Sequence, residues 1–82
     1  MPRSNFKRHG VDFADAATIL FDEMAITVKE DSVNAEQRYV TLGMDSLGRC
    51  LVVVYTWRGE GVRLISARTA TRSERLQYEG KR

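Results

Sequence analysis

The spacing of apolar residues near the start of the chain predicts two short helices. Residues 3–9 are polar and end at Gly10, a residue type that commonly follows the last turn of a helix. Asp12 then has the features of an N-cap. The apolar residues after it recur at the i, i+3, i+4, i+7 spacing of a buried helix face, as Phe13, Ala16, Ala17 and Leu20. We expect a helix over 3–9 and a second one that begins after Asp12.

Beyond Asp22-Glu23 the pattern is typical of strands. The central segment Leu51-Val-Val-Val-Tyr55 is an unbroken apolar run, as in a strand buried on both faces. An acidic loop is expected at 30–36, and turns are expected at 45–48 and 58–61. The predicted strands are 24–29, 37–44, 49–57 and 62–68.

Thr71-Arg-Ser-Glu74 forms a capping-box pattern, which predicts a final helix that runs to about Glu79 and stops at Gly80. Together the elements indicate one α+β domain over residues 1–82, and no repeat or linker divides them. The expected architecture is two short N-terminal helices, a four-stranded antiparallel meander and a C-terminal helix, with the helices against one face of the sheet.

Charge is distributed unevenly along the 82 residues. Residues 1–40 carry five basic and seven acidic side chains, and residues 41–82 carry eight basic and four acidic ones, so the halves are −2 and +4. The positive charge of the second half is mostly arginine. This indicates an acidic or phosphate-bearing partner, although a solvated surface would have the same composition.

Cysteine usage and motifs narrow the function classes. A single cysteine, Cys50, fits a reducing cytosol, and no signal peptide or membrane-length apolar run is found, so we expect a cytoplasmic protein. One Cys and one His argue against a structural zinc site. Nucleotide-binding and metalloprotease motifs are missing, and the acidic loop lacks the pattern of a calcium or magnesium site. We therefore expect no metal and no cofactor.

Arginine recurs through the last predicted strand and the start of the last helix. Arg72 and Arg75 fall in the first turn of that helix, where positive charge is unfavourable unless an anion is near. For Arg75 we favour the alternative of an ion pair with Glu79. Arg63 and Arg68 are the better phosphate candidates, but they are five positions apart. They would share a face only if the strand ended or bulged between them.

Histidine and aromatic residues offer further candidates. His9, in the basic segment that includes Lys7, is either a general base or a cap of the preceding helix. Tyr78 either places its hydroxyl beside the sheet or only packs. Trp57 and Tyr55 could stack on a base, or they are packing or partner-contact residues, and Arg58 lies beside Trp57 at the predicted hairpin.

The chain resembles the BrnT toxins of type II toxin–antitoxin systems, which are related to the RelE/ParE toxin fold. The matching stretches are KRHGV with FADAA (7–17), RYVTLG (38–43), RCLVVVYT (49–56) and VRLISARTATR followed by Glu74, Arg75 and Tyr78 (62–78). The last stretch is the most specific. The family usually has a segment resembling FEWD before its first helix, and this chain has Met1-Pro-Arg-Ser-Asn there. From that departure we expect a missing edge strand, an altered start site or reduced activity.

The resemblance implies a RelE-like endoribonuclease that arrests growth and is neutralised by a ribbon–helix–helix antitoxin of the BrnA kind. Operator DNA would be bound mainly through the antitoxin. Metal-free RNA cleavage needs a base, cations and an acid. The corresponding candidates are Arg63 and Arg68 as phosphate stabilisers with Arg72 assisting, His9 or Lys7 as base, Tyr78 as acid, and Arg58 and Trp57 as substrate contacts.

Two other readings stay open from the sequence. A non-enzymatic interaction protein, such as a ParE-like inhibitor or a co-repressor that bridges antitoxins, would use the same basic segment to bind protein or DNA. An RNA-binding module without catalysis would be expected to display several aromatic residues on one sheet face. The strands offer only Tyr39, Tyr55 and Trp57 for that role.

Overall fold

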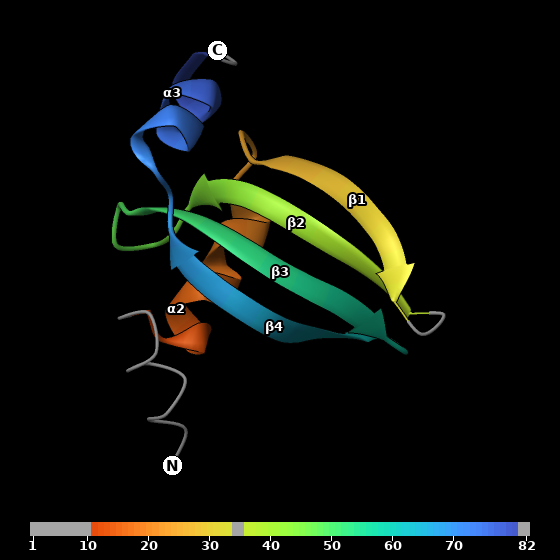
Figure 1. Ribbon diagram of the computed structural model, residues 1–82. Coiled ribbons are helices and arrows are strands. Elements are labelled where there is room, and N and C mark those ends of the chain that lie inside the picture. Colours follow the sequence, from red (N-terminus) through yellow and green to blue (C-terminus); the bar gives the residue numbers. More distant parts are fainter. Residues whose placement is uncertain (1–10, 34–35, 81–82) are drawn as a thin grey trace.

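The fold is an antiparallel meander with helices at both ends of the chain (Figure 1). This computed structural model describes residues 11–33 and 36–80. The sheet has the strand order β1-β2-β3-β4. The elements are α2 (Phe13–Ala16), the 3₁₀ helix η1 (Ala17–Phe21), β1 (Ile26–Val33), β2 (Glu36–Met44), β3 (Cys50–Arg58), β4 (Gly61–Thr69) and α3 (Arg72–Gly80). The α+β class, the four-stranded antiparallel sheet and the C-terminal helix are thus confirmed.

One N-terminal α-helix is described where the sequence predicted two. The helix expected over 3–9 lies outside the described residues. The helix expected after Asp12 is present as α2, and the Asp12 side chain caps it by accepting a hydrogen bond of 2.8 Å from the Ala14 amide. This helix is only four residues long and continues as the tighter η1 from Ala17 to Phe21.

The acidic loop expected over 30–36 is wrong for most of its length. Strand β1 continues through Val33, and β2 already begins at Glu36. Pairing explains the difference, because Glu30 lies opposite Arg38 and Val33 opposite Glu36, with a register shift between the two pairs. Cross-strand pairing therefore outweighs the poor strand propensity of these polar residues.

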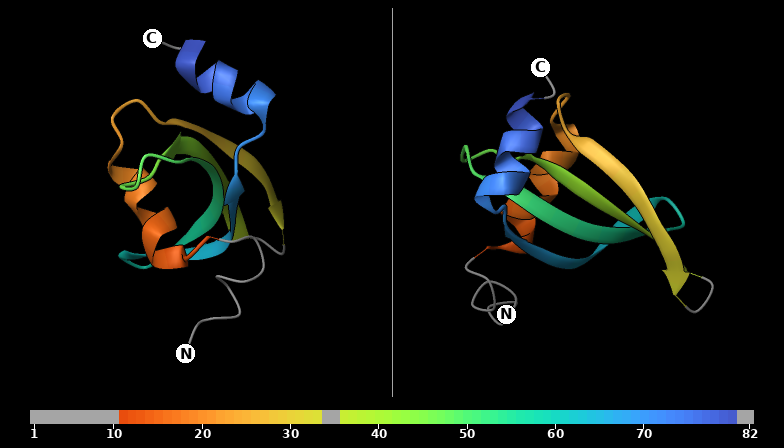
Figure 2. Two further views of the ribbon diagram at one scale, coloured as in Figure 1. Left: turned by 90° about the vertical axis from the view of Figure 1, so that its left-hand side faces the viewer. Right: turned by 45° about the horizontal axis from the view of Figure 1, so that its top comes forward.

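Helices cover both faces of the sheet, which corrects the expectation that all of them lie on one. Figure 2 shows the sheet curving around α2 and η1, with α3 on the other side near one end. On the inner face, Ile19 of η1 packs with Leu51 and Val53 of β3. On the outer face, Tyr78 of α3 packs with Val52. Successive strand residues point to opposite faces, so the predicted two-sided burial of β3 is confirmed.

Asp22, just after η1, connects the two layers at the end of the sheet. Its carboxylate accepts hydrogen bonds from the Tyr78 hydroxyl at 2.6 Å, the Met44 amide at 2.9 Å and the Met24 amide at 3.0 Å. Burial raises the pKa of Asp22, but these hydrogen bonds outweigh it and hold the pKa below its ordinary value of 3.8. The ionised form of Asp22 therefore helps to fix α3 against the sheet.

Candidate functional site

A β-bulge in β4 decides how the predicted arginines are arranged. Val54 of β3 pairs with Ser66, whereas the next residue, Tyr55, pairs with Leu64, so Ile65 is the extra residue of the bulge. Beyond the bulge the alternation of side chains shifts by one position. Arg63 and Arg68 lie opposite Thr56 and Val52, which are four residues apart on β3 and therefore share a face. The bulge places both arginines on the outer face.

The register of the strands shows what else shares that face. Along the outer face, the cross-strand neighbours form three rows that run from β1 to β4. We call this surface the arginine face. The first row joins the pairs Glu30–Arg38 and Thr56–Arg63, because continuing the β2–β3 register one residue past its last pair, Tyr39–Tyr55, sets Arg38 beside Thr56. The other two rows are Val28, Val40, Val54 and Ser66, then Ile26, Leu42, Val52 and Arg68. Helix α3 lies near the last row. The first row is at the opposite end of the sheet, where β1 leads into β2 and β3 leads into β4 (Figure 1); we call this the hairpin end.

Spacing within the arginine face ranks the neighbours of Arg63. Arg68 is two rows away, about 13 Å along the strands at about 3.3 Å per residue. Arg38 is in the same row as Arg63 and two strands away, about 10 Å at about 4.8 Å per strand. Thr56 stands between them, and its hydroxyl donates a 2.7 Å hydrogen bond to the Gln37 carbonyl that ties β3 to β2 at this row. Arg38 is thus nearer to Arg63 than Arg68 is.

Ion pairing separates the arginines into two groups. Four are paired with carboxylates: Arg49 with Asp45 and Asp15, Arg58 with Glu36, Arg68 with Glu74, and Arg75 with Glu79. The Arg75–Glu79 pair, at 3.1 Å, confirms the prediction made for Arg75. Within residues 11–33 and 36–80, the arginines without a carboxylate partner are Arg38, Arg63 and Arg72. Two of these three are in the first row of the arginine face.

Arg68 is held by the start of α3. Its two terminal nitrogens donate hydrogen bonds of 2.9 and 2.8 Å to the two Glu74 oxygens. The same carboxylate accepts a 2.8 Å hydrogen bond from the Thr71 amide. The Thr71 hydroxyl in turn accepts from the Glu74 amide at 3.2 Å, so the predicted capping box is confirmed. The Arg68 guanidinium first, and then the Thr71 amide, lower the pKa of Glu74 from 4.5 to about 2.

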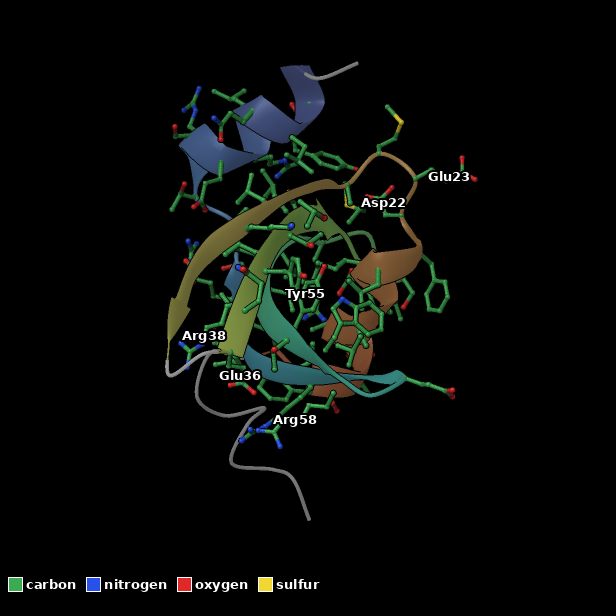
Figure 3. The ribbon with its side chains drawn as sticks, turned by 90° about the vertical axis from the view of Figure 1, so that its right-hand side faces the viewer. Asp22, Glu23, Glu36, Arg38, Tyr55 and Arg58 are labelled. Atoms are coloured by element: carbon green, nitrogen blue, oxygen red, sulfur yellow. The ribbon has the colours of Figure 1, made fainter. Side chains whose placement is uncertain are left out.

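Arg58 belongs to the hairpin end of the arginine face. It forms an ion pair of 3.2 Å with Glu36 across β2 and β3. Figure 3 shows both residues at the same end of the sheet as Arg38, far from Asp22. Trp57, by contrast, alternates with Arg58 and faces the inner side, where its ring is roughly perpendicular to that of Tyr55 with the ring centroids 6.5 Å apart. The structure therefore brings Arg58, but not Trp57, to the face of Arg63.

The aromatic and basic candidates have different surroundings. Tyr55 is buried, stacks on Tyr39 with ring centroids 5.7 Å apart and hydrogen-bonds Thr41, so it is committed to packing. Tyr78 is 7 % exposed, and its hydroxyl hydrogen-bonds Asp22. Both are held inside the protein rather than presented to a ligand. His9 and Lys7 lie outside the described residues.

Arg38 is a candidate site residue that the sequence analysis did not identify. Its Nε is buried and has no hydrogen-bond acceptor in the described part of the chain. A second buried nitrogen of this kind, on Arg49, lies 2.9 Å from the Asp45 carboxylate and is therefore paired electrostatically. Strand alternation puts Arg38 on the same side as Val40 and Leu42, which is a signal that the sequence contains. What the sequence lacked was the register that sets it beside Arg63.

A hollow of about 310 Å³ opens at the hairpin end and is lined by Glu36, Gln37, Tyr39, Thr56 and Trp57. No three His, Cys, Asp or Glu side chains in residues 11–33 and 36–80 form a group that could hold a metal ion. In the same part of the chain, no helix has the length and apolar character to cross a membrane.

Comparison with known proteins places the chain in a family. No individual curated protein matches it. The family model described as the ribonuclease toxin BrnT of type II toxin–antitoxin systems matches residues 2–74, which is most of the chain and includes every residue of the arginine face. A type II system pairs its toxin with an antitoxin, so an antitoxin partner comes with the family. The chain therefore belongs to the BrnT family of ribonuclease toxins of type II toxin–antitoxin systems.

Proposed function

We propose that the chain is a metal-independent endoribonuclease of the cytoplasm that cleaves RNA on the arginine face. The observation that carries the proposal is the shared face of Arg63 and Arg68, together with the lack of a carboxylate partner for Arg63 among the described residues. An arginine left unpaired on an open sheet face favours a ligand that carries negative charge. The phosphodiester groups of RNA are such a ligand, and the family is one of ribonucleases.

The chemistry follows from what these side chains can do. The 2′-hydroxyl attacks the neighbouring phosphorus, a base removes its proton, and the bond from phosphorus to the 5′-oxygen breaks as an acid protonates that oxygen. The products are a 2′,3′-cyclic phosphate and a 5′-hydroxyl. Arg63 stabilises the charge on the pentavalent phosphate, and its guanidinium supplies the positive charge that a metal ion supplies elsewhere. Arginine stays protonated, so the base is His9 or Lys7.

The remaining candidates have secondary roles in the proposal. Arg68 contributes positive charge while Glu74 holds it. Arg72, which pairs with no carboxylate in the described part of the chain, is in the first turn of α3 and assists in binding the RNA backbone. Arg58 contacts a flanking nucleotide at the hairpin end, whereas Trp57, which faces the inner side with Tyr55, is left as a packing or partner-contact residue. Tyr78 is given a packing role because it is buried and its hydroxyl bonds to Asp22, which leaves the acid to a group other than Tyr78.

The proposed antitoxin is a ribbon–helix–helix protein that neutralises the toxin by binding it. Operator DNA would then be recognised through the antitoxin rather than through this chain. Sequencing the adjacent reading frame tests this part directly. A small downstream protein with a ribbon–helix–helix pattern is the expected result, and an antitoxin with another DNA-binding fold would contradict it.

The enzymatic proposal is tested by incubating the purified chain with RNA in EDTA. Cleavage that persists in EDTA and leaves 2′,3′-cyclic phosphate ends is the expected result. Intact RNA, with the protein bound to it or to DNA, would support the non-enzymatic interaction protein instead. Cleavage that EDTA abolishes and Mg²⁺ restores would retain the ribonuclease but remove its metal independence.

A further inference from the structure

The first row of the arginine face places two positively charged side chains, Arg38 and Arg63, on either side of the buried Thr56. Arg38 and Arg63 stand about 10 Å apart at their backbones, on either side of Thr56, with no carboxylate partner in the described residues. Arg38 on β2 and Arg63 on β4 are separated only by β3, and two like charges this close repel each other, so the arrangement is unfavourable unless an anion lies between them. The other described arginines of this face, Arg58 and Arg68, are already neutralised by Glu36 and Glu74.

The Arg38 side chain adds a second, independent observation. Its Nε is shielded from solvent and finds no acceptor in the described part of the chain. Buried donors are normally satisfied, so an unsatisfied one marks a place where an acceptor from outside would be favourable. Glu30, which is the β1 neighbour of Arg38, makes no ion pair with it in the structure. An incoming oxygen would therefore complete the hydrogen bonding of this guanidinium.

The floor beneath the two arginines has a fixed geometry. Thr56 is 2 % exposed, and its hydroxyl proton is already committed to the Gln37 carbonyl. It therefore spaces the strands and leaves the anion to the guanidinium groups. The next row, with half-buried Val40 and Val54 and the 54 % exposed Val28, offers an apolar surface on which a nucleobase can lie beside the charged row.

We infer that Arg38 and Arg63 form a two-guanidinium clamp that binds one phosphodiester group of the RNA over Thr56, with Arg38 as a further substrate-binding residue. This inference rests on the proposed ribonuclease function and deepens it. Two planar guanidinium groups on opposite sides of a phosphate can donate to its oxygens from both sides, whereas a single arginine reaches them from one side only. The adjacent valine row receives the base attached to that phosphate.

Binding to an uncleavable RNA tests the clamp without depending on catalysis. The probe is a short single-stranded RNA with a 2′-O-methyl group on every ribose, and Kd is measured against salt concentration. Each lost phosphate contact lowers the slope of log Kd against log salt by about 0.7. We expect R38Q and R63Q each to lower the slope and to weaken binding about tenfold, and the double variant to lower the slope by about 0.7 in total, because both arginines hold one phosphate.

The controls separate the clamp from general charge and from folding. Lys29 adjoins Glu30 on β1 but faces the inner side, because it pairs with Tyr39. K29Q removes the same charge and should leave the slope unchanged. R38K keeps the charge and should keep the slope while binding more weakly than the wild type, because lysine lacks the planar fork. E30Q removes a negative charge beside Arg38 and should tighten binding.

Each outcome has a definite meaning. Equal slopes for R38Q and K29Q, in variants that melt like the wild type, would overturn the clamp, as would a wild-type chain that does not bind the probe. A loss of slope in R38K like that of R38Q would show that Arg38 acts through the fold, which also overturns it. A chain that cleaves RNA with an unaffected R38Q keeps the proposed function and loses the clamp. A chain that never cleaves but shows the expected slopes does the reverse.

Discussion

Glu74 is the residue whose replacement tests the electrostatics of the α3 terminus most sharply. It serves as the capping-box carboxylate for Thr71 and as the ion-pair partner of Arg68. Glutamine in its place keeps the capping geometry, because either residue can fill that position of the box. It removes the charge that holds Arg68. E74Q therefore isolates the ion pair, and E74A removes the pair and the cap together.

The magnitude follows from the pKa of Glu74, which falls from 4.5 to about 2 in the folded protein. At about 1.4 kcal/mol per pKa unit, this shift sets an upper bound of roughly 3 kcal/mol. The Arg68 side chain is 44 % exposed and Glu74 29 %, so solvent screens the pair. We expect E74Q to cost about 1–2 kcal/mol and E74A about 1 kcal/mol more. For a domain of this size, each kcal/mol lowers Tm by roughly 4–8 °C.

The dependence on pH follows from the direction of the shift. Because the folded pKa lies below the unfolded one, the ion pair stabilises fully above about pH 4.5. That contribution is lost as the pH falls from 4.5 towards 2. Denaturant unfolding of the wild type and E74Q should therefore differ by a constant free energy at pH 7 and pH 5. The difference should shrink steadily below pH 4.5.

Two results would refute this reasoning. Equal unfolding free energies for the wild type and E74Q at pH 7 would mean that the ion pair contributes nothing to stability. A difference that stays the same down to pH 2 would mean that it does not arise from the charge of Glu74. Circular dichroism of E74Q must retain the wild-type helix signal for either comparison to stand.

Three further predictions concern other parts of the molecule. Tyr78→Phe should cost about 1–2 kcal/mol through the lost Asp22 hydrogen bond while RNA cleavage is retained; a large loss of cleavage with normal stability would return Tyr78 to the chemistry. Gly43→Ala should destabilise by about 1–3 kcal/mol, because the added Cβ would lie 3.1 Å from the Cβ of Ala25; an unchanged Tm would contradict the tight packing. Arg63→Ala and Arg68→Ala should each relieve growth arrest without loss of the folded state, and full toxicity in both would contradict their proposed role.

Much of the fold was accessible from the sequence because its signals are local. The unbroken apolar run of β3 and the Thr71–Glu74 capping box each depend on residues a few positions apart, and both were predicted correctly. The packing of α3 was not, since nothing in the helix itself tells which face of the sheet Tyr78 will meet. The extension of β1 through Val33 also depends on cross-strand pairing, which overrides the polar composition of that segment.

The candidate site was predictable only in part, for a similar reason. Composition and charge pointed to Arg63 and Arg68. Their shared face depends on the bulge at Ile65, and the local sequence does not predict the position of that bulge. Arg38 is 25 positions before Arg63 in the chain, and only the strand register brings the two into one row. The long-range register of the strands, and not the local sequence, therefore determines which arginines share one face of the sheet.

The central claim is that RNA is cleaved on the arginine face, and single-turnover cleavage in EDTA tests it most directly. The comparison is between R63A, on that face, and K29A, which removes the same charge from the opposite face. Loss of a group that stabilises the transition-state phosphate typically slows cleavage by about 100-fold to 1,000-fold. The account predicts such a loss for R63A and a nearly wild-type rate for K29A. Equal rate constants for R63A and the wild type, or a comparable loss in K29A, would contradict it.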